Sequence, residues 1–244
     1  MINEIAVCLS FISNDYLLML VAVLFYIFSK RSEHANLVIL LLFAMVYKAL
    51  LKETLQMPAP VTSPTTYGFP SGHINFATMF FGCFMITYRT KLLYWMCPIA
   101  LVLASISTIY LGYHDIYDVI LTPILPICVL VIYNIYLKKV DLSNFTLIFI
   151  IISSLCYLVS FFTLDKIPID VVIGSYGILG FGVAILVLSY QLRMLMLCMI
   201  ISLFFFALSG ELINFSKNCI WLLAFGSIPF ISKIIAIIRQ KFSL

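Results

Sequence analysis

The chain has 244 residues, of which 64% are hydrophobic and only 10% are charged, and its formal net charge at pH 7 is +4. A soluble domain of this size could not bury so much apolar surface, so the composition predicts a protein whose main solvent is lipid. The basic residues form no dense patch of the kind that binds nucleic acid, so the sequence argues against a nucleic-acid partner.

The apolar runs predict an all-helical bundle of about nine transmembrane helices, because a spanning helix needs about 20 apolar residues. Residues 1–14 carry Glu4 and lack a basic start, so we expect a short interfacial helix there and no signal peptide. The loop 56–70 is rich in proline and threonine and should cap one end of the bundle. The predicted spans cover residues 15–29, 35–55, 73–88, 92–110, 116–137, 144–163, 170–190, 193–209 and 219–237.

The lysines and arginines predict the orientation of these spans, because cytoplasmic connections carry an excess of basic residues. One set of alternate connections holds Lys30, Arg31, Arg89, Lys91, Lys138, Lys139, Arg193, Lys233, Arg239 and Lys241, and the opposite set holds Lys48, Lys52, Lys166 and Lys217. With the larger set inside, the N-terminus is outside and the C-terminus inside. His73 and His114 then both lie on the outer face, which in a bacterial inner membrane is the periplasmic face.

The seven cysteines indicate packing, not a disulfide framework or a zinc site. Their number is odd, their spacing is irregular and no Cys-x-x-Cys pair occurs. Small apolar side chains inside helices are the simpler interpretation.

The first polar stretch that suggests chemistry is Tyr67-Gly-Phe-Pro-Ser-Gly-His73. Ser71 is well placed to cap a helix that begins near His73. The start of a helix presents free backbone N–H groups and a partial positive charge, which together attract a phosphate. His73 would act there as an acid that protonates a leaving oxygen. The alternative is an ordinary capped helix start with a histidine at the membrane interface.

The second stretch is Tyr110-Leu-Gly-Tyr-His114-Asp-Ile-Tyr-Asp118. His114 and Asp118 are four residues apart, so on a helix the carboxylate could accept the ring N–H of the imidazole. That bond fixes the tautomer and leaves the other ring nitrogen as a nucleophile or base. A hydrogen-bonded pair that merely stabilises a helix end is the alternative. A metal site made by His73, His114 and Asp118 is conceivable but is not favoured, because no further ligands are in reach.

On these residues the sequence resembles the type 2 phosphatidic acid phosphatases, the PAP2 superfamily, which share a fold with vanadium haloperoxidases. The family carries three motifs: Lys, six residues, Arg-Pro; Pro-Ser-Gly-His; and Ser-Arg, five residues, His, three residues, Asp. The stretch from Pro70 to His73 matches the second motif in full. The third is matched at Ser107, His114 and Asp118, and the ends of the first at Lys52 and Pro60. The resemblance covers about residues 15–137.

The resemblance implies a core of about five or six spanning helices with additional helices after it. We therefore expect a catalytic core over residues 1–140 and further transmembrane helices of the same membrane domain over 141–244. His114 would be the nucleophile that forms a phospho-histidine intermediate, Asp118 its orienting partner and His73 the general acid. The phosphate oxygens would be held by Lys52, Ser71 and Gly72. The expected substrate is a lipid phosphate or lipid diphosphate, and no cofactor or metal is implied.

Two positions depart from the family pattern, because Ala59 and Thr108 stand where the first and third motifs have arginine. Each arginine would bind the phosphoryl oxygens with charge-assisted bonds worth about 1.5–3 kcal/mol. Losing both would remove about 3–6 kcal/mol, or roughly 10²–10⁴ in rate. Lys48, one turn before Lys52, could supply a replacement cation, and Thr108 could donate a neutral hydrogen bond.

Three interpretations follow from the matches and the departures. The chain is a membrane-bound lipid phosphatase or lipid phosphotransferase with a rebuilt pocket, or a catalytically degenerate relative that binds a lipid phosphate or a partner protein. The third is a purely structural membrane component. The intact histidines and aspartate favour the first. The sequence does not indicate the oligomeric state.

Overall fold

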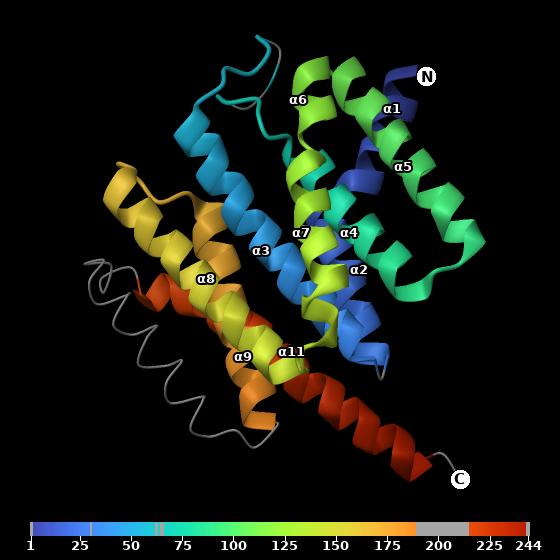
Figure 1. The fold of residues 1–244 in the computed structure, drawn as a ribbon, viewed down its shortest axis with the longest axis vertical. Helices are drawn as coiled ribbons and strands as arrows, with labels where there is room; N and C mark the ends of the chain where they lie inside the picture. The colour runs from blue at the N-terminus through green and yellow to red at the C-terminus, as the bar shows by residue number, and fades with distance from the viewer. Residues whose placement is uncertain (1, 30, 62, 64–65, 189–214, 243–244) are drawn as a thin grey trace. The chain divides into compact units, whose positions relative to one another are not determined.

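The computed structural model describes residues 2–29, 31–61, 63, 66–188 and 215–242. The regular structure of these residues is helical (Figure 1), and the extended pairing among them is one isolated antiparallel bridge between Pro58 and Tyr67. The all-helical fold predicted from the sequence is therefore confirmed.

The chain forms two compact units. Unit 1 comprises Met1–Ala22 and Lys48–Lys139, and unit 2 comprises Val23–Tyr47 and Val140–Leu244. Two helices, α2 (Asp15–Phe28) and α3 (Ser32–Leu55), begin in one unit and end in the other. The catalytic core expected over residues 1–140 and the additional transmembrane helices expected over 141–244 stay predictions.

Unit 1 is built around α4 (Gly72–Tyr88), which packs against α5 (Lys91–Tyr110) and α7 (Ile124–Ile135). The remaining elements of this unit are α1 (Ile2–Ser10), η1 (Phe11–Ser13), α6 (Ile116–Leu121) and η2 (Leu137–Lys139). The N-terminal helix α1 packs along α5, where the Ser107 hydroxyl donates to the carbonyl of Ala6 over 2.6 Å. The segment predicted as an interfacial helix is thus helical and is tied to α5.

The ends of α4 are set by local chemistry. Its C-terminus ends at Arg89, whose backbone is left-handed with φ 50°. The Lys138 ammonium donates to the carbonyl of Ile86 over 3.0 Å, which satisfies one of the open carbonyls at this helix end. Arg89 and Lys138 therefore lie at one end of unit 1, and His73, in the first turn of α4, lies at the other end.

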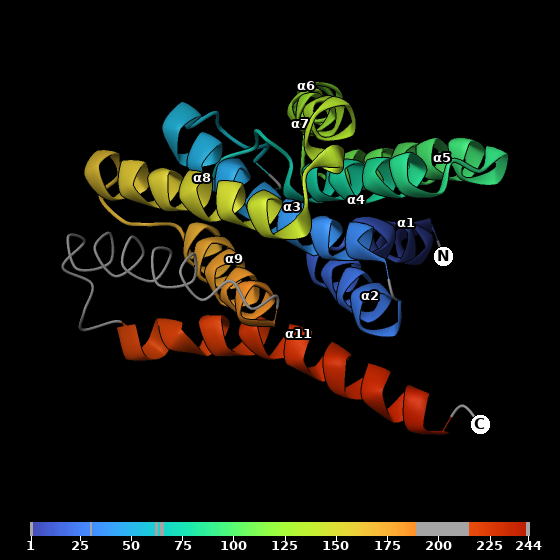
Figure 2. The same ribbon diagram turned by 60° about the horizontal axis from the view of Figure 1, so that its bottom comes forward.

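Unit 2 contains the first part of α3 with α8 (Leu142–Thr163), α9 (Ile169–Leu188) and α11 (Phe215–Phe242). Helix α9 packs against both α8 and α11 (Figure 2). The approach is close, because a Cβ added at Gly180 would lie 2.9 Å from the Cα of Leu222 on α11. A Cβ at Gly174 would lie 2.6 Å from the carbonyl oxygen of Leu42 on α3. Glycine is needed at both positions because backbone atoms occupy the space.

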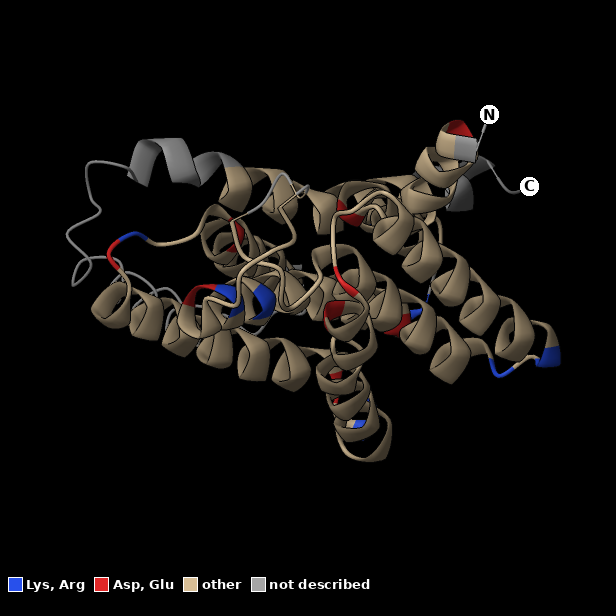
Figure 3. Ribbon diagram, turned by 90° about the horizontal axis from the view of Figure 1, so that it is seen from above, with Lys and Arg blue, Asp and Glu red and all other residues tan. Residues whose placement is uncertain are grey.

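Five of the described helices are long and apolar enough to cross a membrane, or six if α1–η1 and α2, which meet at 44°, form one span. The five are Ser32–Leu55, Lys91–Tyr110, Ile116–Ile135, Leu142–Thr163 and Ile169–Val187. Charged residues are correspondingly sparse on the ribbon (Figure 3). These helices indicate an integral membrane protein.

The total of nine spans predicted from the sequence is not confirmed. Helix α4, expected to span over 73–88, has 17 residues, and the apolar part of α11 is the shorter stretch Trp221–Ile235. The span expected at 193–209 lies outside the described residues.

Candidate functional site

The loop before α4 folds back on itself and brings its backbone to the start of α6. Its base is held by two backbone bonds, from Gly68 N–H to the Met57 carbonyl over 2.9 Å and from Ala59 N–H to the Thr66 carbonyl over 3.2 Å. A Cβ added at Gly68 would clash with Oδ2 of Asp118 and lie 3.2 Å from the Cα of Ala59. Only glycine fits this contact. Ala59, where the family pattern has arginine, thus lies beside the Asp118 carboxylate.

Ser71 occupies the N-cap position of α4, as predicted, but its side chain makes no capping bond. The Oγ atom is fully buried and has no hydrogen-bond partner among the residues that the structure describes. The expected capping role is therefore wrong. A buried hydroxyl without a partner is costly unless a ligand satisfies it.

Thr122 joins the two halves of the site, and the sequence analysis missed it. Its hydroxyl accepts from the Ser71 N–H over 2.8 Å and donates to the carbonyl of Asp118 over 2.5 Å. One side chain thereby fixes the start of α4 relative to α6. A hydroxyl four residues after Asp118 was the available signal, because threonine often bonds the carbonyl one turn before it.

His114 and Asp118 come together, although not on one helix as expected. His114 precedes α6, whose N-cap is Asp115, and Oδ1 of that residue accepts from the Asp118 N–H over 2.8 Å. The Nδ1 atom of His114 lies 3.5 Å from Oδ2 of Asp118, and both side chains are buried. In the described part of the chain neither atom has a hydrogen-bond partner. The predicted hydrogen bond is therefore replaced by a longer contact between the imidazole and the carboxylate.

The surroundings of His114 favour its neutral form. Burial is the main cause that lowers its pKa to about 4, and the positive charges of Lys52 and His73 lower it further. A backbone hydrogen bond with Gly68 and the charge of Asp115 act in the opposite direction. At neutral pH the imidazole is therefore uncharged and retains a nitrogen lone pair for attack.

His73 and Lys52 lie at the same end of unit 1 as His114. The charge of Lys52 acts on both histidines, and the charge of His73 acts on His114. The His73 ring stacks on Tyr113, with ring centroids 6.5 Å apart and an interplanar angle of 23°. Tyr113 was not among the predicted site residues. The arrangement places two imidazoles, a carboxylate and an ammonium in one region.

Lys48, predicted as a replacement cation, reaches the start of α4. Its Nζ atom would lie 3.2 Å from a Cβ added at Gly72. The same ammonium forms an ion pair of 3.1 Å with Oδ2 of Asp15, the first residue of α2. Asp15 was not predicted as a site residue, because it is 33 residues from Lys48 in sequence and no motif links the two.

The role expected for Thr108 is not supported. Its side chain is fully buried and its hydroxyl donates to the carbonyl of Ser105 over 3.0 Å. The donor is therefore used inside α5. The neighbouring Ser107 hydroxyl is also used, since it donates to Ala6.

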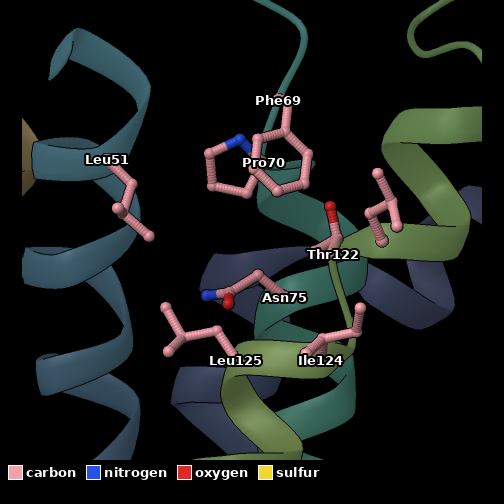
Figure 4. A pocket seen from close by; sticks show the side chains of 8 residues that line it. Leu51, Phe69, Pro70, Asn75, Thr122, Ile124 and Leu125 are labelled. Atoms are coloured by element: carbon pink, nitrogen blue, oxygen red, sulfur yellow. The ribbon is translucent and has the colours of Figure 1, made fainter. Parts of the chain in front are cut away.

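An apolar cavity of about 370 Å³ adjoins the polar groups (Figure 4). Thr122 and Pro70 belong to its lining, next to Ser71. The other lining residues are Leu51, Phe69, Asn75, Leu121, Ile124 and Leu125. The cavity is therefore an apolar space bordered by Thr122, the residue that links α4 to α6.

The arrangement of side chains favours acid–base and nucleophilic chemistry. Within the described ranges, no group of three or more His, Cys, Asp or Glu side chains is placed to hold a metal ion.

The comparisons with known proteins give one match. No curated protein and no solved structure matches the chain. The family model of the PAP2 superfamily matches residues 33–142, which include every residue of the site except Asp15. This segment of the chain is therefore similar to the PAP2 superfamily, in line with its Pro70-Ser71-Gly72-His73 and His114…Asp118 motifs.

Proposed function

We propose that the end of unit 1 that holds His73 and His114 is a phosphoryl-transfer site for a lipid phosphate, working by hydrolysis or by transfer to a lipid alcohol. Similarity to the PAP2 superfamily suggests a phosphatase-like function. The observation that carries the finer proposal is the buried His114 beside Asp118, neutral at pH 7, with His73 at the same end of the unit.

In the proposed reaction, a ring nitrogen of His114 attacks phosphorus while the bond from phosphorus to the ester oxygen breaks. His73 gives its proton to that leaving oxygen. Water or a lipid alcohol then attacks the phospho-histidine, His73 takes the proton of the attacking hydroxyl, and the nitrogen–phosphorus bond breaks. The Asp118 carboxylate, 3.5 Å from Nδ1, orients the ring and stabilises its charged form.

The proposed phosphate cradle is the first turn of α4 with its neighbours. The backbone N–H groups of Gly72 and His73 lie at the positive end of the helix dipole, which attracts an anion. The buried Ser71 hydroxyl, which lacks a partner in the described structure, supplies another hydrogen bond. Lys52 and Lys48 supply cations, and the ammonium of Lys48 already lies against Gly72.

The lipid part of the proposal rests on apolar surroundings. The cavity beside Thr122 is lined mostly by leucine, isoleucine, phenylalanine and proline. Two helices that carry site residues, Ser32–Leu55 with Lys48 and Lys52 and Ile116–Ile135 with Asp118 and Thr122, are long and apolar enough for a membrane. An acyl or isoprenoid tail would therefore lie in apolar space while its phosphate meets α4. From the distribution of basic residues we place this site on the outer face, periplasmic in a bacterial inner membrane, with the C-terminus inside.

The test is a panel of lipid phosphates and lipid diphosphates given to the purified protein, with and without a lipid alcohol acceptor. We expect release of phosphate, or its transfer to the acceptor, that falls at least about 10³-fold in His114→Ala. Ser227→Ala, on the exposed surface of α11, is the matched control and should keep full activity.

Other results would redirect the proposal. Lipid binding with no turnover of any substrate would indicate a degenerate relative that binds without catalysis. Turnover that survives His114→Ala would remove the nucleophile from the scheme. Turnover that is unchanged in Lys48→Ala would remove Lys48 from the phosphate cradle.

A further inference from the structure

Asp15 places a negative charge at the proposed phosphate cradle. It begins α2 directly after the bend of 44°, and Oδ1 of the preceding Asn14 accepts from the Leu17 N–H over 3.0 Å, which fixes this helix start. One carboxylate oxygen of Asp15 lies 3.1 Å from Nζ of Lys48. The other, Oδ1, is buried and has no hydrogen-bond partner within the described residues.

The Asp15–Lys48 pair touches the first residue of α4. A Cβ added at Gly72 would lie 3.2 Å from Nζ of Lys48 and 3.7 Å from Oδ2 of Asp15. The charge of Asp15 also acts on His73. A fixed carboxylate thus lies where the phosphate oxygens would bind, and it repels any anion placed there.

The charges around the two histidines nearly cancel. The cations that act on them are Lys48 and Lys52, and the sheltered carboxylates are Asp15 and Asp118. Asp115 adds a further negative charge, but it is exposed and therefore screened by solvent. His114 is neutral at pH 7 because burial lowers its pKa. The excess positive charge then comes from the start of α4 and from His73 when it is protonated.

We propose that this site selects a singly charged phosphodiester over a doubly charged phosphomonoester, and that Asp15 sets this selection; the inference rests on the proposed function. A phosphomonoester carries about −1.5 to −2 charges at pH 7, whereas a phosphodiester carries one. The second charge of the monoester meets the Asp15 carboxylate, and the described residues that act on the two histidines supply no lysine or arginine beyond Lys48 and Lys52 to balance it. Asp15 is thereby a specificity-determining residue that also positions Lys48.

The chemistry on a diester balances as it does on a monoester. The His114 nitrogen forms a bond to phosphorus, one of the two ester bonds breaks, and the released alcohol takes the proton of His73. The group left on His114 is a phosphoryl group that keeps its second ester. An acceptor alcohol then attacks phosphorus, gives its proton to His73 and releases His114. The product is a new phosphodiester. The reaction on a diester is therefore a transfer between two alcohols.

The test compares two lipids with identical acyl chains, phosphatidic acid as the monoester and phosphatidylglycerol as the diester. Their dissociation constants for the purified protein are measured at pH 8 in neutral detergent micelles, which needs no turnover. We expect the wild type to bind the diester at least about tenfold more tightly. Asp15→Asn should shift the ratio of the two constants about tenfold toward the monoester, since one repelling charge is removed. Asp15→Glu should keep the wild-type ratio.

The double variant Asp15→Asn with Lys48→Met is the matched control, because it removes both charges of the pair and leaves the net charge unchanged. Its affinities should fall for both lipids while their ratio stays near the wild-type value. Thermal unfolding of each variant checks that the fold persists.

A wild type that prefers the monoester would overturn the proposal, even if Asp15→Asn does not fold. A ratio that is the same in Asp15→Asn and in the wild type would also overturn it, as would a double variant that behaves like Asp15→Asn alone. These binding results do not depend on the proposed catalysis. The catalytic proposal would fail separately, if turnover persisted in His114→Ala.

Discussion

Four buried polar atoms at one end of unit 1 and three buried serine hydroxyls of unit 2 differ in their hydrogen bonding. At one end of unit 1, Ser71 Oγ, His114 Nδ1, Asp118 Oδ2 and Asp15 Oδ1 are buried with no hydrogen-bond partner in the described structure. In unit 2 the buried hydroxyls of Ser153, Ser160 and Ser175 donate to backbone carbonyls.

We interpret the atoms of unit 1 as part of a functional site and the hydroxyls of unit 2 as part of helix packing. A buried polar atom without a partner costs roughly 1–3 kcal/mol, and the four atoms at one end of unit 1 belong to the proposed site, where the Ser71 hydroxyl could bond a bound phosphate. Hydroxyls that bond helix carbonyls need no ligand and instead allow apolar helices to carry serine. Substitutions in the first group should change activity, and substitutions in unit 2 should change stability.

The largest effect is expected for Asp118→Asn. The amide cannot stabilise the charged imidazole of His114, so we expect the rate of phosphoryl transfer to fall roughly 10³-fold. The thermal midpoint should change little, because the amide keeps the shape of the buried carboxyl group. Asp165→Asn, in an exposed loop, is the control in a turnover assay. Equal activity of Asp118→Asn and the wild type would contradict the assignment.

Gly180→Ala should give the largest loss of stability. The new Cβ would lie 2.9 Å from two backbone atoms of Leu222, so α9 and α11 must move apart. We expect the free energy of unfolding to fall by about 2–3 kcal/mol. Gly226→Ala, where the nearest backbone atom is 3.2 Å away, should cost less and serves as the graded control. Thermal unfolding in detergent measures both, and an unchanged midpoint for Gly180→Ala would refute the packing.

Gly68→Ala should reduce activity more than stability, which is the opposite of the effect expected for Gly180→Ala. Its Cβ would push against the Asp118 carboxylate, which can move, and would lie 3.2 Å from the Cα of Ala59. We expect activity to fall roughly 10²-fold, since an ångström of displacement at a reacting group has an effect of that size. The loss of stability should be smaller than for Gly180→Ala. If stability falls and activity per folded molecule does not, the loop has no part in the site.

The pH dependence of the rate should reflect the lowered pKa of His114. The nucleophile must be neutral, and its pKa in the folded protein is about 4, below the ordinary 6.5. With a phosphodiester substrate, whose own charge is constant, kcat/KM should therefore not fall through protonation of His114 until the pH nears 4. An ordinary imidazole would lose activity about sixteenfold between pH 6.5 and 5. A fall of that size in the measured profile would show that His114 is not buried as described.

The smallest effect is expected for Ser175→Ala in unit 2. Its hydroxyl donates to the Ser153 carbonyl over 3.4 Å, which is a long and weak bond. We expect a loss of at most about 1 kcal/mol in the free energy of unfolding and no change in activity. A large loss of activity from this substitution would contradict the expectation that substitutions in unit 2 change stability and not activity.

The sequence predicted the helices well where apolar runs have membrane length. The span expected at 92–110 is observed as Lys91–Tyr110, and the span expected at 144–163 as Leu142–Thr163. The bounds expected for the short helix α4, 73–88, agree with the observed Gly72–Tyr88, but its 17 residues are fewer than the roughly 20 that a span needs, because the helix stops at Tyr88. The left-handed backbone of Arg89 sets that end.

The site was only partly predictable. The family motifs and the distribution of basic residues predicted His73 and His114 on one face, and only His114 and Asp118 follow a helical repeat. Asp15 lies 33 residues before its partner Lys48, and only the fold reveals their contact. Thr108 was assigned a hydrogen bond from its position in the motif, but its hydroxyl is used by the Ser105 carbonyl. Local hydrogen bonds of this kind depend on side-chain rotamers, which sequence spacing does not fix.

The most direct test of the account is detection of a covalent intermediate on His114. Purified protein would be mixed with substrate, quenched in alkali within one turnover and digested for mass spectrometry of its peptides. The account predicts a phosphoryl adduct on the peptide that carries His114, with none in His114→Ala. Turnover of the substrate with no adduct at this residue, and at an undiminished rate in His114→Ala, would contradict it.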